Sequence, residues 1–255
     1  MTSHPPSPAG LLVVAVDRLP AWIVPAYGAT WVAMPALDAL AARGIVFDRA
    51  IATTDEADAT LCDLLGDVGG AAAARGWRAA LVTDDATAAV AGADATRVVA
   101  GPKAVPERDA DATCLARLCA AAHDVIAAGG HRLVIVHATG PGTCWDAPAE
   151  FRDAYVDADD PPPPPGAEVP DFDVAADADP DLLVGVRQAY AGQLTLLDRC
   201  LGRVIGAAGA ARWTVLVAGL RGLALGLHGH VGPAAAAAFG ELVHVPAILA
   251  DPAGR

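Results

Sequence analysis

The sequence predicts an α/β fold in which helices cover both faces of a largely parallel sheet. Four short apolar runs are typical of buried strands, and they end at or near Asp17, Thr83, His137 and Ala218. Segments with apolar residues at helical spacing separate these runs. Strands of a parallel sheet are buried on both faces and therefore have nearly continuous apolar sequences. The alternation of such strands with helices indicates one doubly covered sheet.

The elements of the first half follow from local signals. The branched run that begins at Leu11 stops at Asp17, and a proline near the start and Gly44 at the end delimit the first helix. A polar loop over residues 51–65 leads into the start of a helix. The other expected elements are strands over 11–16, 45–47, 78–82 and 98–99, and helices over 34–44 and 71–75.

The second half continues the alternation. Leu183, Tyr190, Leu197 and Val204 belong to an apolar stripe at 3–4 residue spacing, which predicts a long helix packed on the sheet. The expected helices cover 111–128, 183–204 and 234–238, and the expected strands cover 132–136, 213–217 and 243–249.

The chain of 255 residues is long enough for a single domain with a sizeable core, preceded by a disordered tail over residues 1–9. Residues 153–181 contain ten acidic and no basic residues and include the proline block 161–165. This composition predicts an acidic, proline-rich surface loop.

The formal net charge of -13 argues against nucleic acid and membrane surfaces as partners. Five cysteines without framework spacing, and no 18-residue apolar run, favour a cytoplasmic protein with reduced thiols.

Several stretches together resemble the sulfatase family of the alkaline phosphatase superfamily over nearly the whole chain. The most specific is the segment from Met34 to Ala50, which is similar to a family stretch T-P-N-L-D-x-L-A-x-x-G-x-x-F-x-x-A. The other matching stretches are 14–17, 145–148 with 151–152, 189–199, 225–229 and 244–249. The resemblance implies an alkaline-phosphatase/sulfatase-like fold, without the smaller C-terminal subdomain that many sulfatases carry.

The resemblance also implies a reaction, the hydrolysis of sulfate esters. The family's nucleophile is a formylglycine made from the Cys or Ser of a [CS]-x-P-x-R motif. A divalent cation, usually calcium, is held by several carboxylates and polarises the ester.

The residues at the matching positions depart from this pattern. Asp17 matches the first metal ligand, but Arg18 stands where a second acid is expected. The nucleophile position falls on Ala57 and the motif arginine on Leu61, and a frame shifted onto Cys62 also lacks the proline and the arginine.

Two further parts of the family site are also changed. The substrate-facing histidine falls on Gly142, and the late metal-ligand pair falls on Leu220 and Arg221. A lysine or histidine expected after the third strand is absent from residues 83–86. A hard dication beside one carboxylate and two arginines would bind weakly. We therefore predict a catalytically inactive pseudoenzyme that needs no cofactor.

A residual pocket is expected from Asp17, Arg18, His137, Arg221 and His228. Arg18 and Arg221 could meet there and bind a free anion without metal. Alternatively, both arginines pair with Asp17 or point to solvent.

Two other functions stay open at this point. The first is an active metal-dependent hydrolase of sulfate or phosphate esters with a threonine nucleophile. Its candidate nucleophiles are Thr53, Thr54 and Thr60, and its candidate ligands are Asp17, Asp55, Asp58, Asp84 and Asp85 with His137 or His228. The second is a non-enzymatic module that binds an active paralogue, a second copy of the chain or another partner. His228 and His230, two residues apart in a glycine-rich loop, are candidate metal contacts or structural histidines.

Overall fold

The computed structural model describes residues 9–101, 106–234 and 239–252. Its centre is a seven-stranded sheet in the order β2-β10-β7-β1-β5-β3-β4. The middle strand β1 (Leu11–Val16) pairs in parallel with β5 (Leu133–Ala138) on one side and β7 (Thr214–Gly219) on the other. The register places Ala15 beside both His137 and Ala218, so these strands end at the same sheet edge. The predicted α/β class is confirmed.

The outer strands complete the sheet. On the side of β5, strands β3 (Ala79–Thr83) and β4 (Ala95–Val98) continue the parallel arrangement. On the side of β7, strand β10 (Ala247–Ala250) runs antiparallel to β7 and to the edge strand β2 (Ile45–Val46). The sheet is therefore parallel except for β10.

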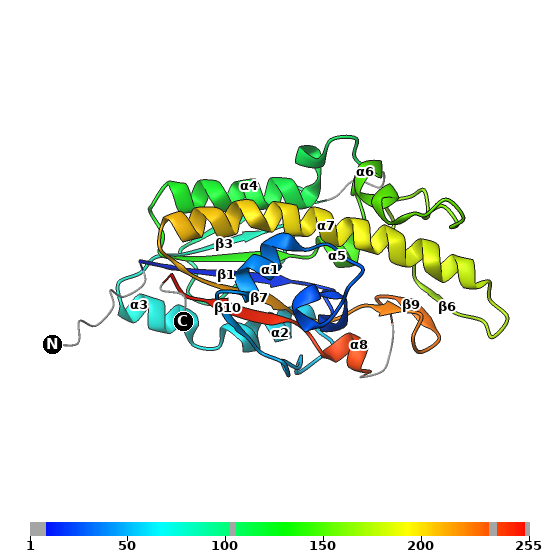
Figure 1. Cartoon of the computed structure of the whole chain (residues 1–255). Coiled ribbons are helices and arrows are strands. Elements are labelled where there is room, and N and C mark those ends of the chain that lie inside the picture. Colours follow the sequence, from blue (N-terminus) through cyan, green and yellow to red (C-terminus); the bar gives the residue numbers. More distant parts are fainter. Residues whose placement is uncertain (1–8, 102–105, 235–238, 253–255) are drawn as a thin grey trace.

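Helices cover both faces of this sheet (Figure 1). The upper layer in that view holds α1 (Pro35–Ala41), α4 (Cys114–Ala127) and α7 (Pro180–Ala210), and the lower layer holds α2 (Ala57–Leu65) and α3 (Val68–Ala74). Four-residue helices α5 (Gly140–Thr143), α6 (Ala149–Arg152) and α8 (Gly240–Val243) and the 3-10 turns Ala21–Ile23, Pro25–Tyr27, Ala110–Ala112 and Asp153–Tyr155 lie in the connections.

Alternate side chains of β1 enter two different apolar cores, as the twofold period of a strand requires. Leu12, Val14 and Val16 pack into the core beneath α4 and α7, whereas Val13 and Ala15 pack into the core that includes Leu61 of α2. Since both faces are buried, no residue of β1 from Leu12 onward is free to be polar until the strand ends. This is why the first polar side chain, Asp17, stands at the sheet edge.

The helix α7 is longer than the apolar stripe predicts. Its N-cap is Asp179, whose side chain accepts a hydrogen bond from the Asp181 N–H. The helix ends two residues before Arg212, which has a left-handed backbone. Its buried Asp198 accepts hydrogen bonds from the N–H groups of Ala36 and Leu37, both at 2.9 Å. Asp198 thus supplies the cap that α1 lacks locally and fixes the two helices together.

The acidic segment 153–181 is more structured than predicted. It contains the turn Asp153–Tyr155, the strand β6 (Phe172–Asp173) and the start of α7. β6 pairs with β9 (His230–Gly232), which pairs with β8 (Ala224–Leu225), and these form a small antiparallel sheet. Strands of two or three residues carry no readable periodicity, so the sequence could not show them. The prolines 161–165 have no regular structure, as expected.

The ends of the chain differ in detail from the predictions. The last strand begins at Ala247 rather than at residue 243, because residues 240–243 form α8 and Pro246 cannot donate a ladder hydrogen bond. Residues 1–8 of the predicted tail and residues 235–238 of the predicted helix lie outside the described residues.

In the described part of the chain, no helix combines the length and hydropathy needed to cross a membrane. The five cysteines, all of them described, form no disulfide.

Candidate functional site

A cavity of about 450 Å³ lies at the carboxyl ends of β1, β3, β5 and β7. In open α/β sheets this edge is where ligands bind. The first turn of α2 closes one side of the cavity and α5 the other. The lining residues are Asp17, Glu56, Ala57, Asp58, Asp84, Asp85, Ala86, His137, Thr139, Thr143 and Arg221. Of the five residues of the predicted pocket, the structure brings Asp17, His137 and Arg221 to this cavity.

Asp17 and Arg221 form a two-point ion pair. The Arg221 Nε donates to Asp17 Oδ1 at 2.7 Å, and Nη2 donates to Asp17 Oδ2 at 3.0 Å. The third nitrogen, Nη1, donates to the carbonyl oxygen of Asp55. Burial opposes the charge of Arg221, but the hydrogen bonds and charge of Asp17 outweigh it and raise the pKa of the guanidinium. Arginine therefore stays charged here, and each oxygen of the Asp17 carboxylate has an arginine donor.

Arg18 leaves the cavity in another direction. Its backbone is left-handed, with φ at 60°, which is uncommon for a residue with a side chain. The guanidinium donates to the carbonyl oxygens of Gly222 at 3.2 Å and Pro233 at 2.9 Å, and its Nε lies 4.0 Å from Asp17 Oδ2. Burial lowers the pKa of Arg18, and the charge of Asp17 partly opposes this. Tyr190 of α7 donates a hydrogen bond to the Arg18 carbonyl and holds this turn in place.

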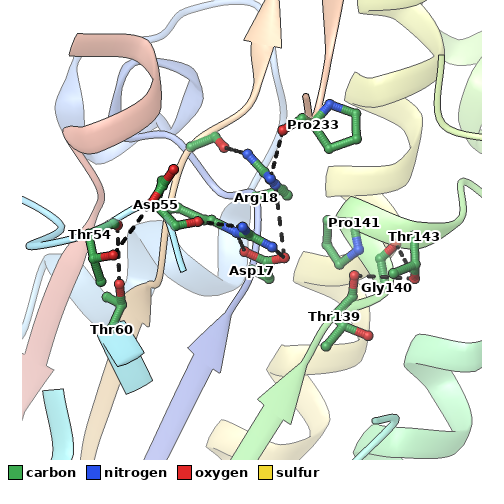
Figure 2. A network of polar contacts seen from close by, with 12 residues as sticks. Asp17, Arg18, Thr54, Asp55, Thr60, Thr139, Gly140, Pro141, Thr143 and Pro233 are labelled. Carbon is green, nitrogen blue, oxygen red and sulfur yellow. Dashed lines mark hydrogen bonds and ion pairs between the residues drawn. The ribbon is translucent and has the colours of Figure 1, made fainter. Parts of the chain in front are cut away.

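Gly142 lies against the stem of Arg18. A Cβ at position 142 would be 2.6 Å from Arg18 Cγ and 3.1 Å from Asp17 Oδ2. In Figure 2, Asp17 and Arg18 form one group of side chains, and Thr139, Gly140 and Thr143 lie opposite them. The position of the family's substrate histidine thus faces Asp17, but Arg18 fills the space that a histidine would need.

Two acidic residues after β3 serve local structure. Both oxygens of Asp84 accept hydrogen bonds: Oδ1 from the Thr139 N–H and hydroxyl, and Oδ2 from the Gly140 N–H, at 2.8, 3.0 and 3.0 Å. Asp84 thus anchors the start of α5. Asp85 accepts hydrogen bonds from the N–H and hydroxyl of Thr87, which lower the pKa of its carboxyl group.

His137 of β5 is fully buried at the bottom of the cavity. Its Nδ1 lies 3.2 Å from the Thr83 hydroxyl oxygen. Its Nε2 has no hydrogen-bond partner among the described residues. His137 is therefore held by β3 through one nitrogen only.

The residue that the resemblance assigns to the nucleophile position is an alanine and carries no nucleophile. Ala57 is the first residue of α2 and lines the cavity, and Leu61 is buried in the core one turn later. The candidate nucleophiles Thr53, Thr54 and Thr60 do not line it. Their hydroxyls donate to Asp63, Asp55 and the Thr54 carbonyl, respectively.

Other candidate residues lie elsewhere, which corrects the predicted pocket. The His228 Nδ1 is 2.9 Å from Glu241 Oε1, and its ring stacks on Phe239 at 3.8 Å. His230 of β9 lies between Asp171 and Asp173 of the segment that contains β6, so its contacts belong to the small sheet and not to the cavity. Leu220 is buried in the core.

Glu56, Thr139 and Thr143 also line the cavity, although the sequence pattern does not single them out. Thr139 follows His137 by two residues at the end of β5. The rule that singled out Asp17, namely a polar residue just beyond a buried strand, would have found it.

Calcium, the cation that the sulfatase resemblance implies, does not fit these residues. It needs several carboxylate oxygens at once, whereas Asp17 and Asp84 are fully engaged with protein donors. Arg221 adds a fixed positive charge beside Asp17. Among the described residues, no three His, Cys, Asp or Glu side chains are arranged to hold a metal ion.

Comparison with known proteins identifies the fold. No family model matches the chain, and no curated protein matches it in sequence. Among solved structures, the phosphonate monoester hydrolase of Agrobacterium radiobacter matches with a TM-score of 0.74 and 18% identity, over 98% of this chain and 70% of that one. A 2-O GAG sulfatase, BT1596, matches with a TM-score of 0.67 and 18% identity, over 96% and 65% of the two chains. The C-terminal periplasmic domain of EcEptC from Escherichia coli matches with a TM-score of 0.67 and 14% identity, over 96% of this chain and 73% of that one.

These matches show that the chain has a sulfatase-like α/β fold. The fold implied by the sequence resemblance is thus confirmed. Identities of 14 to 18% carry the fold and not the activity.

Proposed function

We propose that this protein is a catalytically inactive, sulfatase-like pseudoenzyme. One observation carries the proposal: the two-point ion pair between Arg221 and Asp17 stands where the resemblance places a metal and its ligands. The pair supplies from within the chain the positive charge that a cation would otherwise bring to Asp17. A dication could enter only if the pair broke and left a charged arginine beside it, which is costly in a part-buried site.

The rest of the cavity supports the same interpretation. Ala57 brings a methyl group to the nucleophile position, and Gly142 leaves no proton donor at the substrate-histidine position. At the positions that the resemblance assigns to them, the described residues thus offer no nucleophile, no metal site and no substrate-facing histidine to stabilise charge on a transferring group. The threonine-nucleophile hydrolase is less well supported, because none of Thr53, Thr54 and Thr60 lines the cavity.

A simple anion site is also less well supported. The guanidinium of Arg221 is directed at Asp17 and Asp55, and that of Arg18 at two backbone carbonyls. Five carboxylates line the cavity beside Arg221 and would repel an anion. We therefore assign to this protein a non-enzymatic role as a binding partner or scaffold.

An assay with an internal control tests the proposal. The native protein and the variant Asp17→Asn are offered aryl sulfate, aryl phosphate and aryl phosphonate monoesters with Ca²⁺, Mg²⁺, Mn²⁺ or Zn²⁺. We expect equal rates for the two proteins at the level of buffer with metal. Hydrolysis by the native protein that Asp17→Asn abolishes, with the variant still folded by circular dichroism, would show an active enzyme.

A further inference from the structure

A second cavity, of about 600 Å³, lies between the start of α7, the turn Asp153–Tyr155 and the loop that follows β8. It shares no lining residue with the cavity at Asp17. Its volume is in the range of small-molecule sites. Three aromatic side chains and two carboxylates contribute to its wall: Trp22, Trp31, Tyr155, Asp157 and Asp160.

The aromatic wall is held in place before any ligand arrives. The rings of Trp31 and Tyr155 stand at 83° to each other with centroids 6.5 Å apart. The Tyr155 hydroxyl accepts a hydrogen bond from the Ala33 N–H at 3.0 Å and pairs with the hydroxyl of Thr195 on α7. Trp31 is 41% exposed, so part of its surface is open to solvent. The two rings thus stand edge to face at the cavity, with Tyr155 held by hydrogen bonds and Trp31 partly open to a ligand.

The charge at this cavity is mainly negative. Asp160 Oδ2 accepts hydrogen bonds from Gln188 Nε2 at 2.7 Å and from the Asp157 N–H at 3.0 Å, which closes the acidic turn beside the rings. The one basic lining residue, Arg187, directs Nε and Nη2 at the Leu225 carbonyl, at 3.2 and 3.0 Å. The turn belongs to the segment 153–181, which has ten acidic residues and no basic one. This field attracts cations.

The cavity also holds polar groups that the fold leaves unpaired. Gln188 is only 5% exposed, and its Oε1 makes no hydrogen bond to any described residue. The indole N–H of Trp22 is likewise buried without a partner in the described part of the chain. Buried polar atoms are usually paired in a region that serves stability alone. Both residues therefore keep unused hydrogen-bonding capacity next to the cavity that they line.

We propose that this cavity binds an organic cation of the quaternary ammonium class. The faces of tryptophan and tyrosine rings attract a cation through their negative π-density, and ammonium groups that carry methyls are recognised by such aromatic cages. A methylated ammonium group presents no N–H donors to the ring faces. The carboxylates of the acidic turn complement its charge. The proposal does not depend on whether the cavity at Asp17 is catalytic.

A pair of isosteric probes separates charge from shape. Purified full-length protein is titrated by calorimetry with choline and with 3,3-dimethyl-1-butanol, in which a carbon atom replaces the charged nitrogen. We expect choline to saturate one site, with the neutral alcohol at least about tenfold weaker. Equal affinity for the two probes, or no saturable binding of choline, would overturn the proposal.

Three variants locate the binding. Trp31→Leu should weaken choline binding by about tenfold or more, and because Trp31 is 41% exposed the variant should fold. Asp157→Asn should weaken it by about threefold, since an exposed carboxylate contributes less. Asp159→Asn is the matched control, since Asp159 is exposed, lies in the same turn and does not line the cavity. Choline binding that survives Trp31→Leu unchanged would contradict the proposed site.

Discussion

The side chain of Arg18 occupies the space that any side chain at position 142 would need. A Cβ at Gly142 would lie 2.6 Å from Arg18 Cγ. We expect Gly142→Ala to destabilise the protein by about 1–3 kcal/mol through overpacking, although alanine is the better residue for a helix. Urea denaturation measures the change.

Gly101 provides the control for this prediction. A Cβ there meets nothing within 4 Å, so Gly101→Ala should leave the unfolding midpoint almost unchanged. The double variant Arg18→Gly/Gly142→Ala should recover stability, because glycine removes the stem and also suits the left-handed backbone at position 18. A Gly142→Ala protein as stable as the native one would show that Arg18 moves aside freely.

The ion pair between Arg221 and Asp17 leads to a second prediction. Arg221→Met leaves the nearly buried Asp17 carboxylate without its partner and should cost about 2–3 kcal/mol, the lower end for a broken buried pair because Arg221 is part exposed. Asp17→Asn/Arg221→Met removes both charges and should recover most of the loss. Chemical denaturation of the native protein, of the single variants Arg221→Met and Asp17→Asn, and of the double variant gives the coupling energy. Additive effects of the two substitutions would mean that the pair contributes nothing.

A third prediction concerns the anchor of α5. Asp84→Ala removes the three hydrogen bonds from Thr139 and Gly140 and leaves the part-buried Thr139 N–H and the buried Gly140 N–H unpaired. The expected loss is about 2–3 kcal/mol. Asp85→Ala, which affects only a local turn at Thr87, should cost under about 1 kcal/mol. Equal losses in the two variants, measured in urea, would contradict a structural role specific to Asp84.

The small sheet of β6, β9 and β8 carries a pH dependence. Hydrogen bonds to Asp173 and Asp171 raise the pKa of His230 above its ordinary value. The folded state therefore prefers protonated His230, so this stabilisation is complete below the unfolded pKa of about 6.5 and disappears as the pH rises through the higher folded value. The stability advantage of the native protein over His230→Gln should shrink as the pH is raised from about 6 into the alkaline range. An advantage that is constant over this range would argue against the assignment.

The sequence predicts the elements that position the site well, for physical reasons. The run from Leu11 to Val16 is buried on both faces and can only be a central strand, so Asp17 must stand at the edge of the sheet. The stripe through Tyr190 likewise identifies α7. Extended burial leaves a strong pattern in a sequence. The strands β6, β8 and β9 are too short to leave one.

The site itself is only partly readable from the sequence. Asp17, His137 and Arg221 end or follow paired strands, so their convergence follows from topology. A local sequence match groups His228 with them, yet its loop places it against Glu241 and Phe239. Whether Arg18 and Arg221 pair with Asp17, bind an anion or point to solvent depends on side-chain geometry. The sequence left pairing with Asp17 and anion binding open, and neither arginine is directed into free space.

The proposal of a pseudoenzyme depends most directly on whether the protein binds a divalent metal ion. Chelator-stripped native protein is titrated with Ca²⁺, Mg²⁺, Mn²⁺ and Zn²⁺ by calorimetry, and bound metal is checked by mass spectrometry. The variant Arg18→Asp/Leu220→Asp/Arg221→Asn, which returns oxygen ligands to the three altered positions, is titrated alongside as the comparison. We predict no stoichiometric site in the native protein and a gain of divalent-cation affinity in the variant. A stoichiometric native site of micromolar or tighter affinity that Asp17→Asn removes would contradict the pseudoenzyme and restore the metal-dependent hydrolase.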